Sequence, residues 1–188
     1  MTVMFRIQRL FTAALITLTL AGVARAQTAP DRKDFQTFQD VAKQVRQYVN
    51  FTVFDNVSAN VDNGVVTLTG QVTMPYKVND LTRRVSRVDG VRKVDNQIQV
   101  LPVSRFDDEL RYRIARAIYG NPTFWHYAAM ANPPIHIVVE RGQVTLSGVV
   151  NSNVERALAR SLAIGFGEFS VKNELKTDAE MKDLLEKM

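Results

Sequence analysis

Cysteine is missing from the 188-residue sequence, and histidine and tryptophan are scarce, with two copies and one copy respectively. Without cysteine the chain has no disulfide framework, no thiolate nucleophile and no residue for lipid acylation after export. The two histidines, His126 and His136, do not stand at metal-ligand spacing with a carboxylate. No nucleophile-elbow or phosphate-loop motif occurs either. We therefore expect no catalytic residue, no metal, no cofactor and no enzymatic activity.

Long apolar runs are also missing, except near the N-terminus. There Arg6 and Arg9 precede an uncharged, mostly apolar run over residues 10–24, and Ala24-Arg25-Ala26 has the small-x-small pattern of a cleavage site. The run is shorter than the roughly 20 apolar residues of a bilayer span. Residues 1–26 are therefore predicted to be a cleaved signal peptide, and the mature chain is expected in the periplasm without lipidation. The alternative is an uncleaved N-terminal anchor.

The excess of positive charge is small. The full sequence has 24 basic and 19 acidic residues, a net charge of +5, and removing Arg6, Arg9 and Arg25 with the signal peptide leaves +2. Proteins that bind nucleic acid concentrate basic residues on one surface. The weak charge and the predicted export together argue against a nucleic-acid partner.

Two segments of the sequence are nearly the same. Residues 63–72 read NGVVTLTGQV and residues 141–150 read RGQVTLSGVV, 78 positions further on. This distance is too long for a solenoid repeat and fits two copies of one small domain. We therefore expect a duplicated domain, with copies at residues 35–101 and 106–177 and a short tail helix at residues 178–188.

The apolar pattern predicts the same element order, α-β-β-α-β, in both copies. In the first copy the residues predict a helix near 38–48, strands near 57–61 and 66–72, a helix from about 75 and a strand at 94–100. Asn63-Gly64 predicts the tight turn between the first two strands. In the second copy the second helix is expected to turn Val154, Leu158 and Leu162 inward.

Two motifs recur in the same order in both copies. The pattern G-x-V-T-L-[ST]-G occupies residues 64–70 and 142–148, and V-x-N-x-[LI] occupies residues 94–98 and 171–175. Together they resemble the BON domain of osmotically inducible periplasmic proteins and related envelope proteins. The resemblance implies two tandem α/β (α+β) domains, each with two helices on a three-stranded sheet, a role in the envelope and stress response, and phospholipid association without catalytic residues. One departure is FGEF at residues 166–169, where the first copy has VDGV.

The copies differ most before the first strand. From Val45 to Val57 is 12 positions and from Ile114 to Ile135 is 21, which indicates an insertion of nine residues. The insert, at residues 121–134, contains the only tryptophan and has prolines at both ends. Its aromatic residues either pack onto the second domain and its seam with the first, or form an exposed contact surface. The candidate membrane or partner contacts are Phe124, Trp125, Tyr127 and Met130.

Three weaker signals have ordinary structural interpretations. Arg83 and Arg87 lie opposite the apolar stripe of their helix, where they form either a headgroup site or a solvated face. Gly70 and Gly148 indicate a bulge or a helix packed too closely for a side chain. His136 occupies an outward strand position and is expected to be solvated.

The residues and the resemblance predict a non-enzymatic envelope protein that binds phospholipid, in particular an anionic membrane surface. The alternative is a chaperone-like or assembly factor that binds protein clients.

Overall fold

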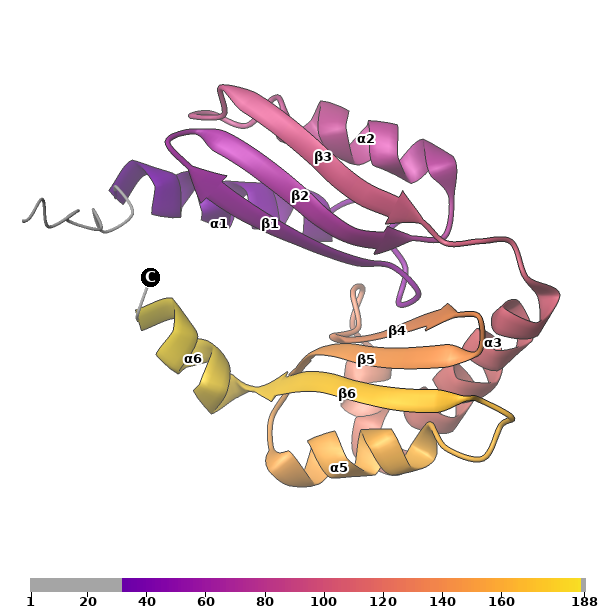
Figure 1. Ribbon diagram of the computed structural model, residues 1–188. Coiled ribbons are helices and arrows are strands. Elements are labelled where there is room, and N and C mark those ends of the chain that lie inside the picture. The colour runs from indigo at the N-terminus through magenta and orange to yellow at the C-terminus, as the bar shows by residue number, and fades with distance from the viewer. Residues whose placement is uncertain (1–31, 187–188) are drawn as a thin grey trace, which may run out of the picture.

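The computed structural model describes residues 32–186, so the predicted signal peptide lies outside the described residues. Both copies have the order helix, strand, strand, helix, strand (Figure 1). The first contains α1 (Arg32–Arg46), β1 (Asn56–Asp62), β2 (Val65–Val72), α2 (Pro75–Val85) and β3 (Lys93–Val100). The second contains α3 (Arg105–Tyr119), β4 (Ile135–Glu140), β5 (Gln143–Val150), α5 (Asn153–Leu162) and β6 (Ser170–Thr177). Helix α6 (Asp178–Glu186) follows, and the insert forms η1 (Pro122–Phe124) and α4 (Trp125–Ala128).

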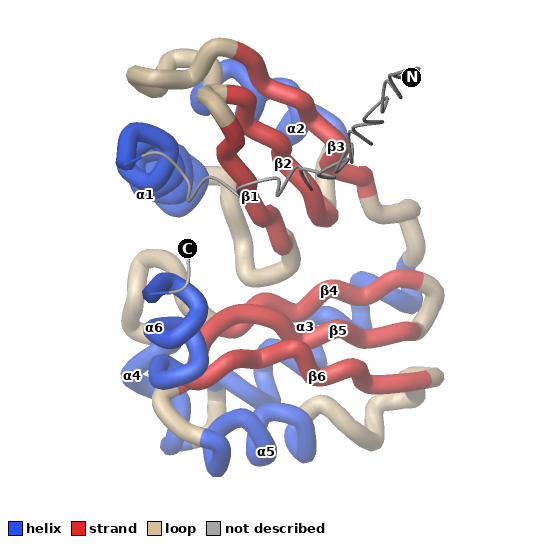
Figure 2. Tube along the Cα trace, turned by 60° about the vertical axis from the view of Figure 1, so that its left-hand side comes forward, coloured by secondary structure: helices blue, strands red, loops and turns tan. Residues whose placement is uncertain are grey.

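Each copy has a three-stranded sheet with its second strand in the centre. Strand β1 runs antiparallel to β2 and β3 runs parallel to it, and β4, β5 and β6 repeat this arrangement. The register is conserved as well, because Ala59 faces Leu68 and Ile137 faces Leu146. Figure 2 shows α3 and α5 on one face of the second sheet. The predicted tandem α+β fold is confirmed.

Apolar side chains between the helices and the sheet form one core in each copy. The first core includes Val41, Val45, Val66, Leu68, Leu81 and Val85, and the second includes Leu110, Ile114, Ile118, Ile137, Leu146 and Ala159. The predicted inward position of Val154 is wrong, because this side chain is 76% exposed. Ala159 and Ala163 form the buried stripe of the second copy there, and their small side chains gave a weaker pattern than Leu81 and Val85.

Asparagines of the V-x-N motif join the last strand to the second helix. Asn96 donates from Nδ2 to the Val78 carbonyl at 3.0 Å and accepts from the Ile98 amide at 2.9 Å. Asn173 donates to the Arg156 carbonyl at 2.9 Å and accepts from the Leu175 amide at 3.2 Å. The motif is therefore structural, since its side chain satisfies backbone groups at the helix–strand contact.

An aspartate in the first turn of each first helix holds the following hairpin turn. Asp34 accepts from the Gly64 amide at 3.0 Å, and Asp107 accepts from the Gly142 amide at 2.8 Å. Gly64 and Gly142 have φ of 71° and 75°, as the tight turn requires. The turn predicted at Asn63-Gly64 is present.

These aspartates also correct the size of the insert. Asp34 and Asp107 are 73 positions apart, whereas the strands are offset by 78, so the insertion is five residues rather than nine. The equivalent of Val45 is therefore Ile118, not Ile114. Helical spacing alone left this choice open, because a shift of four residues retains the apolar face.

Gly70 and Gly148 mark a close approach between backbones. They have φ of 117° and 115°, and an added Cβ would lie 2.1 Å from the Asn56 carbonyl oxygen and 1.8 Å from that of Pro134. The neighbour is thus the backbone at the start of the adjacent strand and not a helix, and the expected bulge is absent, because the pairing includes both glycines without a break.

The loop between α1 and β1 joins the two copies. The Val53 carbonyl accepts from the Ile137 amide of β4 at 2.6 Å, and the Phe54 ring packs edge-on against Tyr112 of α3 at 5.2 Å. His136 packs against Phe51 at 5.4 Å between ring centroids. The expectation of a solvated histidine is wrong, because His136 is half-buried and its Nδ1 is enclosed. Burial also lowers the pKa of His136 below its ordinary value. Inter-copy packing is not visible in local sequence patterns.

Candidate functional site

The structure divides the four candidate residues of the insert into two pairs. Phe124 is fully buried and Tyr127 is 4% exposed, whereas Trp125 and Met130 are 61% and 47% exposed. The rings of Phe124 and Tyr127 stack at 6.0 Å, because a spacing of three places both on the inner side of this short helical segment. Phe124 and Tyr127 are therefore core residues and are removed from the candidate contact surface. Trp125 and Met130 remain accessible.

Tyr127 replaces one half of a buried polar pair of the first copy. There Asp55, fully buried, binds Lys77 Nζ at 2.6 Å and the Thr73 amide at 2.8 Å. At the equivalent corner of the second copy, Glu155 accepts from the Tyr127 hydroxyl at 2.7 Å and from the Asn151 amide at 2.9 Å. Burial, together with the hydrogen bond to Glu155, raises the pKa of Tyr127 to about 12. The Asp55–Lys77 pair in the first copy and the Glu155–Tyr127 pair in the second copy each hold the turn before the second helix.

The two basic candidates also have different environments, because Arg83 lies in the last turn of α2 and Arg87 follows the end of this helix at Val85. Arg83 forms an ion pair with Asp80, which accepts from the Tyr48 hydroxyl at 2.7 Å. Arg87 instead lines a hollow of about 500 Å³ between α1 and α2, together with Lys43 and Arg84. Asp40 and Asp89 line the same hollow, so its basic charge is partly compensated.

A second hollow, of about 480 Å³, occupies the equivalent place in the second copy, between α3 and the loop after α5. Its position corresponds to the first hollow, since Arg113 and Arg116 of α3 stand 73 positions after Asp40 and Lys43. Its chemistry is different, because Tyr112 and Phe166 add aromatic surface there. The two copies thus present the same groove with different side chains.

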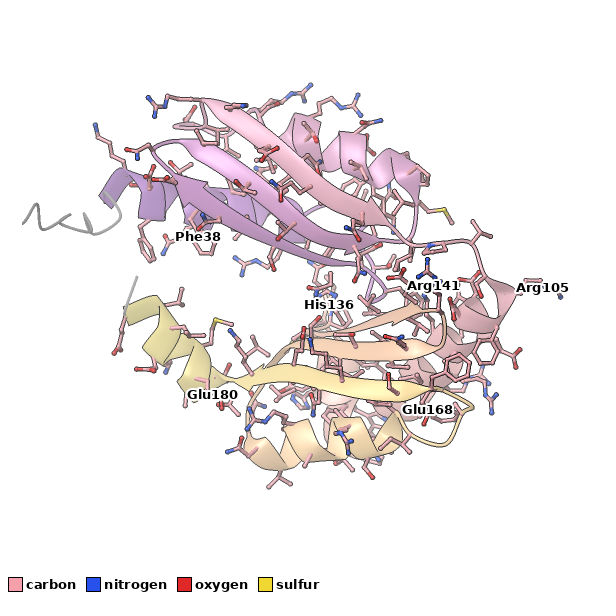
Figure 3. All side chains as sticks on the ribbon, viewed as in Figure 1. Phe38, Arg105, His136, Arg141, Glu168 and Glu180 are labelled. Atoms are coloured by element: carbon pink, nitrogen blue, oxygen red, sulfur yellow. The ribbon has the colours of Figure 1, made fainter. Side chains whose placement is uncertain are left out.

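Exposed aromatic side chains extend from this hollow along α3. We define the α3 face as the exposed rings and arginines of α3 and the α5–β6 loop, namely Phe106, Tyr112, Arg113, Arg116, Phe166 and Phe169. The exposed fractions of Phe106, Tyr112 and Phe169 are 49%, 65% and 79%. Figure 3 shows that Arg105, Arg141 and Glu168 lie at the same end of the second copy. The face therefore combines apolar rings with the positive charge of Arg113 and Arg116, which Glu109, 3.9 Å from Arg113, partly compensates.

Local contacts position the rings of the α3 face. The Arg113 guanidinium lies 5.2 Å from the centroid of the Phe166 ring. Glu168 accepts from the amides of Gly165 and Phe166, both at 2.8 Å, and the Gly165 hydrogen bond contributes most to holding the pKa of Glu168 below its ordinary value. An added Cβ at Gly142 would lie 2.8 Å from the Phe169 ring. The ring is thus held against the hairpin turn.

The sequence predictions did not include this face, although one signal was visible. FGEF at residues 166–169 departs from the VDGV of the first copy and supplies two of its rings. The outward position of Tyr112 follows from the helical spacing of Leu110, Ile114 and Ile118, which are buried.

No group of histidine and carboxylate residues that could hold a metal occurs among residues 32–186. Within the same residues no helix is both long and apolar enough to span a bilayer.

Comparison with known proteins identifies the repeated unit. The model of the BON domain matches residues 37–102 and again residues 107–179. Comparison with curated proteins gives no match. Two solved structures of CdsD, a structural protein of the type III secretion system of Chlamydia trachomatis, are similar at low identity. The first is 16% identical, covers 79% of this chain and 97% of the chain in that structure, and has a TM-score of 0.28. The other, its C-terminal domain, is 15% identical, covers 74% and 94%, and has a TM-score of 0.25. The two matches to the family model cover most of the chain, which therefore belongs to the BON domain family and contains two BON domains in tandem.

Proposed function

We propose that this protein is a non-enzymatic periplasmic protein that binds anionic phospholipid at a membrane surface through the α3 face. BON domains occur in periplasmic and membrane-associated proteins and are generally non-enzymatic, which supports this setting. The observation that carries the proposal is the grouping of exposed rings with Arg113 and Arg116 on one side of the second copy. The ring of Tyr112, with its polar hydroxyl, suits the interface between lipid and water, and the phenylalanine rings supply apolar surface to bury there.

The expected energies favour the rings as the main source of affinity. A basic residue near anionic lipid contributes about 1 kcal/mol. An aromatic side chain buries about 150–250 Å² at roughly 25 cal/mol per Å², which is several kcal/mol as an upper bound. The arginines therefore select anionic lipid, and the rings hold the protein at the surface.

Flotation of the mature chain with phosphatidylglycerol–phosphatidylcholine vesicles tests the proposal. The unmodified chain is expected to float with these vesicles and to remain behind with pure phosphatidylcholine. The double variant Arg113→Gln with Arg116→Gln loses about 2 kcal/mol, or roughly 30-fold in affinity. Phe169→Ser also weakens binding to the phosphatidylglycerol-containing vesicles, because its ring is 79% exposed and available to lipid.

Two matched variants serve as controls. Trp125→Ala with Met130→Ser removes two exposed residues of the insert, and Arg83→Gln with Arg87→Gln removes equal charge from the first copy. Both are expected to float like the unmodified chain. Failure of the unmodified chain to float, or loss of flotation in these variants alone, would contradict the proposal.

A further inference from the structure

The outer edge of β4 is paired at three successive positions that face away from β5. The Ile135 carbonyl accepts from the Tyr119 hydroxyl, and the Val139 carbonyl accepts from Arg111 Nη2 at 2.5 Å. Between them the Ile137 amide donates to the Val53 carbonyl at 2.6 Å. Two side chains of α3 and one backbone segment from the first copy thus cover the edge of this strand.

The covering segment, Val53 with Phe54, lies between α3 and β4. Val53 bonds to the strand, and Phe54 packs against Tyr112 of the helix and against the core of the second copy. The chain therefore shows what the groove between the first helix and the first strand accepts. It accepts a backbone turn with an aromatic side chain, since the Asp55 amide donates to the Thr52 carbonyl at 3.1 Å around Val53 and Phe54.

The equivalent edge in the first copy has no such partners. Val57, Ala59 and Val61 stand 78 positions before Ile135, Ile137 and Val139 and have the same register against the central strand. Their outward backbone groups have no hydrogen-bond partner within residues 32–186. Arg46 and Phe38 stand where the second copy has Tyr119 and Arg111, and no hydrogen bond joins either side chain to β1. An unpaired strand edge is a template for pairing with another chain.

An apolar groove of about 290 Å³ runs beside this edge. Its lining comes from α1, from Phe51 and from consecutive residues 56–59 of β1, and its apolar side chains include Phe38, Ala42 and Val45. Figure 3 shows Phe38 directed into the space between the two copies, where His136 also lies. The charged or titratable groups of the lining are Arg46 and His136, and neither is acidic.

We propose that the groove between α1 and β1 binds a turn of a partner polypeptide that carries an aromatic side chain, as the second groove binds Val53 and Phe54. The carbonyl of the segment accepts from the Ala59 amide, and its aromatic side chain enters the groove beside Ala42. An acidic residue after the aromatic one suits the positive charge of Arg46. Another molecule of the same protein fits this groove less well. The second domain of such a molecule has Ala131 and Asn132 at the positions of Val53 and Phe54, so it offers no aromatic side chain there.

The probe for this groove is a capped peptide with the sequence of residues 50–56, NFTVFDN. It is titrated into the isotope-labelled mature chain, and amide shifts and hydrogen exchange are followed by NMR. Saturable shifts are expected at Ala59 and Val61, with at least about tenfold slower exchange of the Ala59 amide. The Ile137 amide, already bonded to Val53, should not change. This measurement needs no variant of the protein.

Two controls separate the groove from adventitious contact. Ala42→Trp fills the groove and should weaken the peptide at least about tenfold, whereas Ala157→Trp, at an exposed position of α5, should leave affinity unchanged. A peptide with alanine in place of Phe54 should also bind more weakly. The proposal is overturned if the peptide does not saturate, if Ala42→Trp binds it equally well, or if exchange rises at Ile137 while Ala59 is unaffected.

Discussion

At the scale of single residues, the corner before the second helix is held by opposite arrangements in the two copies. In the first, the loop supplies the carboxylate of Asp55 and the helix supplies Lys77. In the second, the helix supplies the carboxylate of Glu155 and the insert supplies Tyr127. Replacing one residue of either pair by its counterpart from the other copy would leave a charge without its partner, which is strongly destabilising in a buried site.

Replacing Asp55 by Asn tests this corner. Lys77 is 2% exposed, so the substitution leaves a buried ammonium without its counter-charge, and we expect a loss of about 3–5 kcal/mol in unfolding free energy. Chemical denaturation at neutral pH measures this loss. The exposed Asp62→Asn is the matched control and should change stability little. Equal stability of both variants would contradict the assignment.

The same pair predicts a dependence on pH. Burial alone raises the pKa of Asp55, but the Lys77 ion pair and the backbone amides of Thr73 and Thr52 bring it below its ordinary 3.8. A carboxyl with a lowered folded-state pKa stabilises the fold above its unfolded pKa, and that contribution disappears as the pH falls through the folded value. The difference in unfolding free energy between the unmodified chain and Asp55→Asn should therefore have its full size above about pH 4 and become smaller below this pH.

At the scale of elements, the order of helices and strands could be predicted because its signals are local. Alternation and the Asn63-Gly64 turn predict the hairpin without reference to the rest of the chain. The length of the insert could not be read in this way, because the apolar face of α3 looks the same after a shift of four residues. Only the contact from Asp107 to Gly142 fixes the alignment.

The division of the insert gives a prediction for two adjacent residues. Phe124→Ala removes a fully buried ring and should lower the unfolding free energy by about 3–5 kcal/mol. Trp125→Ala removes a side chain that is 61% exposed and should change stability by less than about 0.5 kcal/mol. Thermal melts of the two variants measure the difference. A similar loss from both would show that Trp125 is packed in solution.

At the scale of the whole molecule, the second copy depends on the first. Val53, which belongs to the other copy, covers the edge of β4, and the neighbouring Phe54 packs edge-on against Tyr112. The environment of His136 and the position of Phe54 could not be predicted, because contacts between copies leave no periodic signal. The sequence does show FGEF at residues 166–169 as a departure from the first copy, and this segment contributes to the α3 face.

Phe54→Ala tests this dependence. Its ring is half-buried against the second core, so we expect the second copy to lose about 1–3 kcal/mol and the Ile137 amide to exchange faster. The first core should keep its stability. Val49→Ala, at a side chain that is 89% exposed just before the same loop, is the control and should leave both unchanged. Unaltered exchange at Ile137 in Phe54→Ala would mean that Val53 stays in place without the ring.

The position of Val53 in the chain has a consequence during synthesis. Polypeptides are made from the N-terminus, so the loop that covers β4 exists before β4 does, and N-terminal domains generally fold first. Val53 is therefore available to cover the edge of β4 as soon as the second sheet forms, and this edge has little time to pair with another nascent chain. A circular permutant that starts at α3 would reverse this order and leave β4 uncovered while the remainder is being made.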